Sequence, residues 1–175
     1  MRRKFIIFFI FCCLIIISAC DNSQDTVLPK NYIDTHYKNY EQLNVMDDKQ
    51  RMLYLLKQNR TYQLLIFKGK DSTFIYEGGI ETDAPYGHMK IGTDDSIHVI
   101  VFIDNSIIKA ERYEFDLSTS DDNEDKLIIS LDGLSKLDTY FIKSYEFSPP
   151  YTSISQLRFY DKSGKRIDET AFGVH

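Results

Sequence analysis

The chain has 175 residues and a formal net charge of −5, from 21 basic and 26 acidic residues. This acidic balance disfavours binding to nucleic acid and to anionic lipid headgroups, because both repel negative charge. The N-terminus differs from the rest: Met1-Arg2-Arg3-Lys4 precedes an uncharged apolar run from Phe5 to Ile17, and Ser18-Ala19 follows. These are the parts of a secretory signal. A membrane span is excluded, since the run is shorter than the roughly 18 apolar residues that a span needs.

Residues Ile17-Ser18-Ala19-Cys20 resemble the lipobox of bacterial lipoproteins, in which a branched apolar residue and two small residues precede a cysteine. The resemblance implies cleavage between Ala19 and Cys20, diacylglycerol on the Cys20 sulfur, and often a third acyl chain, such as palmitate, on the new amino group. Two or three acyl chains anchor a protein stably, whereas one chain binds only marginally. The membrane is therefore an expected partner through Cys20.

Asp21-Asn22 directly follows this cysteine and resembles the signal that keeps lipoproteins in the inner membrane of enterobacteria-like cells. It implies the periplasmic face of the inner membrane if the source is Gram-negative. The alternatives are the outer membrane or a Gram-positive cell surface, where Asp21-Asn22 only begins a polar tether. The expected organisation is a removed signal peptide (1–19), a lipidated cysteine with its tether (20–30) and a single β-rich domain (31–175).

Removal of residues 1–19 changes both the charge and the cysteine content. It leaves 156 residues with a net charge of −8, because the removed segment holds three basic residues and no acidic one. Cys12 and Cys13 leave with it, and Cys20 carries lipid. The mature domain is therefore expected to have no thiol, which excludes disulfides, thiol catalysis and cysteine-based metal sites.

Hydrophobic periodicity predicts one helix followed by strands. Between residues 31 and 46, Ile33, Tyr37, Tyr40 and Leu43 recur at helical spacing. Beyond Gln50 the period becomes two, and the expected strands are 51–57, 61–67, 73–77, 96–103, 107–117, 126–131, 139–147, 155–160 and 165–168. Gly78-Gly79 is expected to end the third of these strands, and Gly164 to occupy a left-handed turn in the last hairpin.

Two strands carry a clear burial pattern. Ser96 to Ile103 is apolar on both alternating faces, which predicts a central strand covered on both sides. Tyr113, Phe115 and Leu117 alternate with charged residues, which predicts a half-buried strand. The sequence thus predicts a mainly β fold: an antiparallel β-sandwich or barrel-like sheet of about eight or nine strands, with a short N-terminal helix.

The acidic loop 118–125 is a weak candidate for a metal site. Asp121, Asn123 and Asp125 occupy the first, third and fifth places of an EF-hand-like loop, with Asp132 at the twelfth. Lys126, however, replaces the glycine that this loop requires, and the flanks predict strands rather than helices. EF-hand chemistry is therefore excluded, and a looser oxygen-ligand site is weighed against a solvated charged loop, which is the more usual role of such a run.

The other chemical candidates are scattered. The four histidines, His36, His88, His98 and His175, lack the spacing of a helical metal site, although His88 and His98 could combine with Asp94 or Asp95 in space. Motifs of serine nucleophiles, phosphate loops and dinucleotide sites are absent from the sequence. Tyrosine suits contact surfaces, and the tyrosines proposed to line a partner face are Tyr32, Tyr37, Tyr40, Tyr145 and Tyr151.

Two functions from different classes remain open. The first is a non-enzymatic interaction module that binds an envelope protein, as an inhibitor, an immunity-type protein or an assembly accessory. The second is a small-ligand-binding or hydrolytic β domain whose histidines and carboxylates converge only in three dimensions. No cofactor is expected, and the sequence favours the first function.

Overall fold

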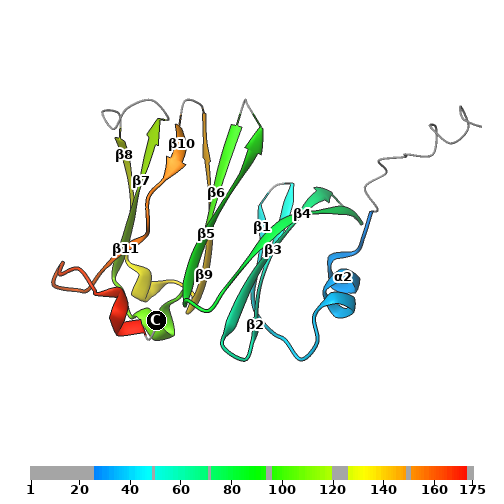
Figure 1. The fold of residues 1–175 in the computed structure, drawn as a ribbon, viewed down its shortest axis with the longest axis horizontal. Helices are drawn as coiled ribbons and strands as arrows, with labels where there is room; N and C mark the ends of the chain where they lie inside the picture. Colours follow the sequence, from blue (N-terminus) through cyan, green and yellow to red (C-terminus); the bar gives the residue numbers. More distant parts are fainter. Residues whose placement is uncertain are drawn as a thin grey trace, which may run out of the picture.

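The computed structural model describes residues 26–48, 50–70, 72–93, 96–119, 126–148 and 151–172. In these residues eleven antiparallel strands form three sheets, and helix α2 (Pro29–His36) precedes them. Figure 1 shows the sheets side by side, with α2 outside the stack. The predicted mainly β fold and the short N-terminal helix are confirmed. The described strands form no closed barrel.

Sheet A is a meander of four strands in chain order. It consists of β1 (Glu41–Asp48), β2 (Arg51–Gln58), β3 (Thr61–Lys70) and β4 (Thr73–Thr82). Helix α2 begins with Pro29, whose fixed φ suits a first helical turn. The helix covers the outer face of sheet A, where Ile33 packs with Leu65 and Phe67.

Sheet B is the middle layer. Its strands are β5 (Tyr86–Thr93), β6 (Ser96–Asp104) and β9 (Tyr140–Phe147), with β6 in the centre. Ile100 and Phe102 pack toward sheet A, whereas Val99 and Val101 pack toward the third sheet. Strand β6 is thus covered on both faces, as its uninterrupted apolar sequence predicts.

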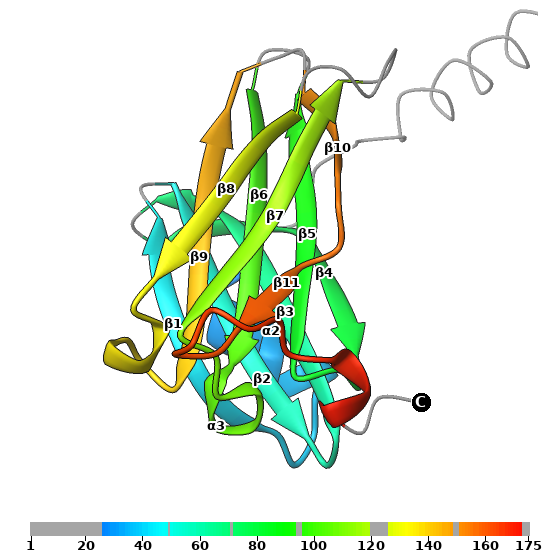
Figure 2. The ribbon, with the colours of Figure 1, turned by 90° about the vertical axis from the view of Figure 1, so that its left-hand side faces the viewer.

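Sheet C is the layer farthest from α2 (Figure 1), and Figure 2 views the molecule from its side. Its central strand is β7 (Arg112–Thr119), with β8 (Lys126–Asp132) on one side and β10 (Tyr151–Ile154) and β11 (Arg158–Tyr160) on the other. Tyr113, Phe115 and Leu117 are buried against sheet B, which confirms the half-buried pattern. Short helical segments α3 (Asn105–Ile108), η1 (Leu134–Lys136) and η2 (Glu169–Phe172) complete the chain.

The helix predicted between residues 31 and 46 is too long. It ends at His36, and residues from Glu41 onward form β1. The register between β1 and β2 shifts between Gln42 and Asn44. This bulge lets Leu43 and Met46 both pack into the core between sheets A and B, so a spacing of three that imitates a helix comes from an irregular strand.

Strand β5 was not predicted, because its two glycines and its polar residues break the apolar pattern. Gly87 pairs with Phe102 of β6. A Cβ at position 87 would lie 2.5 Å from Phe102 Cε1, so glycine is required for close packing rather than for a turn.

Other predicted boundaries also change. Strand β4 continues through Gly78-Gly79 to Thr82, because both glycines remain paired with β3. Residues 105–108 form α3, with Asp104 as its N-cap, and β7 begins only at Arg112. Strand β10 was missed, and the last hairpin is shorter than predicted: β11 spans only Arg158–Tyr160, and Arg166 forms a single bridge to Tyr160. Gly164 has a φ of 79°, as predicted for the hairpin turn.

Candidate functional site

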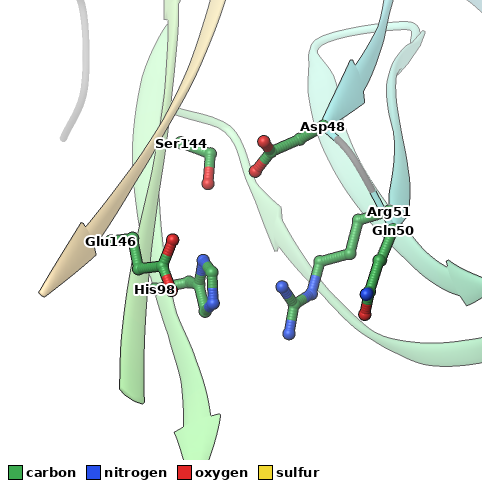
Figure 3. A pocket seen from close by; sticks show the side chains of 6 residues that line it. All are labelled: Asp48, Gln50, Arg51, His98, Ser144 and Glu146. Atoms are coloured by element: carbon green, nitrogen blue, oxygen red, sulfur yellow. The ribbon is translucent and has the colours of Figure 1, made fainter. Parts of the chain in front are cut away.

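A polar cleft opens between sheets A and B at one end of their shared core. It has a volume of about 320 Å³. Figure 3 shows its side chains approaching from two opposite walls. The lining residues are Asp48, Gln50, Arg51, His98, Ser144 and Glu146.

Strand pairing brings these residues together. Asp48 is paired with Arg51 in the hairpin of β1 and β2, which forms one wall. On the other wall, His98 of β6 is paired with Glu146 of β9. Paired residues share a face of the sheet, and this face continues into the apolar core through Ile100. The cleft is therefore the polar end of the space between sheets A and B.

Arg51 is already engaged within the cleft wall. Its Nε donates to Glu77 Oε2 at 2.8 Å, and its Nη2 donates to Glu77 Oε1 at 3.4 Å. The side chains of Arg51 and Glu77 are 11% and 24% exposed, so this pair is partly desolvated and stronger than a surface ion pair. Glu77 neutralises the guanidinium, and Asp48 and Glu146 supply the carboxylates that line the cleft.

Ser96, His98 and Glu146 form a connected group. The Ser96 Oγ lies 3.3 Å from His98 Nε2 and donates to Glu146 Oε1 at 3.3 Å. A serine-hydrolase triad instead places the imidazole between the serine and the acid, with the acid bonded to the far ring nitrogen. Here His98 Nδ1 is buried, with no hydrogen-bond partner among the described residues. The order of the three groups therefore does not match a triad.

His88 and His98 cannot form a shared site. His88 is paired with Val101, whose side chain faces sheet C, whereas His98 is paired with Ile91, whose side chain faces sheet A. The two imidazoles thus lie on opposite faces of sheet B, and their predicted combination is wrong. Burial lowers the pKa of His88, which favours its neutral form. Asp94 and Asp95 lie outside the described residues.

The five tyrosines of the predicted partner face lie in two separate places. Tyr32 stacks on Tyr76 at 4.8 Å on the outer side of sheet A, where Tyr37 and Tyr40 also pack. Tyr145 and Tyr151 pack instead in the core between sheets B and C. The role of these tyrosines in contacting a partner stays a prediction. They form two separate groups rather than one face.

A second polar group lies deep between sheets A and B, centred on Asp104, which is only 1% exposed. The Tyr62 hydroxyl donates to Asp104 Oδ2 at 2.6 Å, and Lys57 Nζ lies 3.6 Å from the same oxygen. Burial and the neighbouring Asp104 raise the pKa of Tyr62. Since β3 and β6 belong to different sheets, this group ties sheet A to sheet B.

The outer face of sheet C carries an ordered set of charges. Arg158 donates two hydrogen bonds to Asp116, at 2.9 and 2.6 Å, and this contact raises the pKa of Arg158. The Tyr160 hydroxyl donates to Glu114 at 2.9 Å, and Arg112 lies 4.3 Å from the Tyr160 ring centre. These side chains are therefore held in place by one another.

Several predicted site residues fall outside the described residues: Cys20, Asp21, Asn22, Asp121, Asn123 and Asp125. In the part of the chain that is described, no three histidine, cysteine or acidic side chains come together to hold a metal ion. The same part contains no helix long and apolar enough to cross a membrane.

Of the cleft residues, only His98 was a candidate in the sequence. Asp48, Arg51 and Glu146 were missed, because the two walls come from segments almost a hundred residues apart. A search against protein-family models, curated proteins and solved structures found no match to this chain.

Proposed function

We propose that this protein is a lipid-anchored component of a bacterial cell envelope whose β domain binds another envelope protein. The observation that carries the proposal is the order of the N-terminal residues: a basic start, an apolar run, and then Ile17-Ser18-Ala19-Cys20. Asp21-Asn22 supports the periplasmic face of an inner membrane, if the cell has two membranes. Acyl chains on Cys20 raise the effective concentration of the domain near partners on the same membrane.

The arrangement of the layers supports a binding role for the ends of the stack. The first described residues run along sheet A, where Val27 pairs with Phe74 of β4. Sheet C lies at the opposite end of the stack (Figure 1) and presents the charged outer face built on Arg158 and Asp116. The other candidate contact surface is formed by Tyr32 of α2 together with Tyr37 and Tyr40, which follow the helix.

Lipid attachment is tested with Cys20→Ser, and Cys12→Ser is its matched control because Cys12 lies within the segment to be removed. Cys20→Ser should abolish labelling by an alkyne fatty acid and accumulate the precursor. Cys12→Ser should be labelled and processed like the original chain, and inhibition of signal peptidase II should block this processing. Normal processing and labelling of the Cys20→Ser chain would refute the anchor.

The binding role is tested by photocrosslinking in the native envelope. A photoreactive phenylalanine at position 160 samples sheet C, and one at position 40 samples the surface formed by Tyr32, Tyr37 and Tyr40. A discrete crosslinked envelope protein from either position would support the proposal. If neither position captures a protein and a small polar molecule raises the melting temperature of the domain, the second function replaces the first.

A ligand-binding or hydrolytic role is favoured by one observation, the cleft around His98. Its buried Nδ1 lacks a hydrogen-bond partner among the described residues, and two carboxylates line the same space. His98→Gln, with His36→Gln on exposed α2 as the control, should remove thermal stabilisation by a cleft ligand. A stabilisation that survives His98→Gln would contradict binding in this cleft.

A further inference from the structure

Strand β8 forms an open edge of sheet C. Among the described residues its only strand partner is β7, to which Lys126–Asp132 is paired without a register shift. Natural proteins usually protect such an edge with a charge, a proline, a bulge or a covering segment. Between Leu127 and Leu131 strand β8 has no charged residue and no proline, and its pairing with β7 has no bulge, so its interior lacks these three protections.

Several other strand edges are interrupted or accompanied. Val27 pairs with β4, and Asn44 of β1 donates a hydrogen bond to the Tyr140 carbonyl of β9. The edge opposite β8 in sheet C is divided into β10 and β11, and the register of β10 shifts between Tyr151 and Ser153. Strands β5 and β9 are regular edges of sheet B, but Lys90 lies within β5, and Lys143 and Glu146 lie within β9. Among the regular edges in the described part of the chain, β8 is therefore the one with an uncharged interior.

Apolar surface on β8 is also incompletely covered. Ile128 is 62% exposed on the outer face, and Leu127 is 37% exposed although it is paired with buried Leu117. Ile129 and Leu131 are only partly buried against sheet B. The neighbouring residues of β7 on this face, such as Phe115, are fully buried. A further strand beside β8 would cover this apolar rim.

We propose that β8 pairs antiparallel with β8 of a second copy of this chain, about a two-fold axis at Ile129. The strand sequence is self-complementary in this register: Leu127 lies across from Leu131 of the other copy, Ile128 across from Ser130, and Ile129 across from itself. Position 126, a lysine in the sequence, lies across from Asp132, whose side chain is 80% exposed and lies 3.9 Å from Arg112 Nε of β7. Opposite charges at paired positions favour this alignment.

The resulting interface is isologous, and it joins two four-stranded sheets into one continuous sheet. The inner apolar rows of the two β8 strands become contiguous and extend the core of sheet C. A foreign extended peptide could also form backbone hydrogen bonds to this edge. The pairing of apolar with apolar and of basic with acidic positions favours a second copy of β8 over a foreign peptide, because this seven-residue strand is complementary to itself.

The test is the oligomeric state of the mature lipidated protein in mild detergent, measured by sedimentation. The original chain should form dimers. Ile128→Lys should weaken dimerisation roughly tenfold or more, because the lysine enters the interface twice. The matched control is Ile107→Lys, since Ile107 is 42% exposed on α3, away from β8, and this variant should dimerise like the original chain. All three proteins carry the same anchor, so anchor-driven association would be equal in all of them.

A second measurement tests the register. Oxidation of an Ile129→Cys variant should yield a disulfide-linked dimer, because directly paired residues lie within disulfide reach. The matched Leu131→Cys variant should stay unlinked, since its two thiols are offset along the strands. A monomeric original chain, equal dimerisation of the two lysine variants, or linkage at 131 rather than 129 would each overturn the proposal. The pairing does not depend on lipid at Cys20, so the two proposals can fail separately.

Discussion

Replacement of Tyr62 by phenylalanine tests the polar link between sheets A and B. The Tyr62 hydroxyl donates to Asp104 Oδ2 at 2.6 Å and accepts from Lys57 Nζ at 2.7 Å. Tyr62 and Asp104 are 2% and 1% exposed, so water does not replace the lost hydroxyl. The substitution keeps the aromatic ring in the core, beside Phe102, and removes one oxygen atom.

The expected loss of stability follows from the remaining partners of Asp104. A hydrogen bond to a charged group contributes about 1.5–3 kcal/mol. Asp104 Oδ1 still accepts from the Ser106 amide at 3.1 Å and the Ser106 hydroxyl at 2.5 Å. Asp104 Oδ2 loses the Tyr62 hydrogen bond but keeps Lys57 Nζ at 3.6 Å, so the carboxylate retains partners. We therefore expect the free energy of unfolding to fall by about 2 kcal/mol, which lowers the melting temperature by roughly 4–8 °C.

Urea and thermal unfolding, followed by circular dichroism, measure this loss. Tyr113→Phe is the comparison, because it removes a hydroxyl that is hydrogen-bonded to the neutral hydroxyl of Tyr145 between sheets B and C. That variant should lose only about 1 kcal/mol. Equal losses in the two variants, or a loss below about 0.5 kcal/mol for Tyr62→Phe, would refute the argument that the buried charge strengthens the link.

Three further predictions concern pH and packing. Burial raises the pKa of Tyr37 to about 12, and burial together with Glu169 raises the pKa of Tyr86 to about 12. These tyrosines therefore lose their protons at lower pH in the unfolded chain than in the folded chain. The free energy of unfolding should fall as the pH rises from about 10 toward 12. Urea unfolding across this range measures the fall, and a constant value would contradict it. Burial lowers the pKa of His88 below 6.5; the unfolded chain then binds a proton more readily, so stability should fall as the pH drops below about 6.5. Acid unfolding of His88→Gln should lack this contribution, while His36→Gln should retain it. Gly87→Ala should lower the free energy of unfolding by about 1–3 kcal/mol, since its Cβ would lie 2.5 Å from Phe102 Cε1. Equilibrium unfolding of Gly87→Ala in a Phe102→Leu background should show a smaller loss. An equal loss in that background would show that the contact with Phe102 is not the cause.

Much of the secondary structure was predictable, because strand periodicity is local. The covered strand β6 and the half-buried strand β7 were recognised from alternation alone. Prediction failed where tertiary contacts override the local pattern. The bulge at Gln42 and Asn44 gave β1 a helix-like spacing, and the packing of Phe102 on Gly87 placed glycine inside β5.

The candidate site was far less predictable than the strands. His98 was a candidate, but its apparent companion His88 lies on the other face of sheet B. The cleft unites His98 and Glu146 with Arg51, and no spacing along the chain links the hairpin of β1 and β2 to β9. The alternation of side chains shows which residues of one strand share a face, because it depends on neighbours in the sequence. It does not show which other strand lies beside them.

The sequence by itself determined the order of the N-terminal residues, the antiparallel β class and the covered nature of β6, because each depends on residues close together in the chain. Only the tertiary structure decided that three sheets stack rather than close into a barrel, that Asp104 joins two of them, and that β8 pairs with β7 alone among the described strands. These features depend on pairing between distant segments, where long-range packing selects among strand partners that the local pattern leaves equivalent.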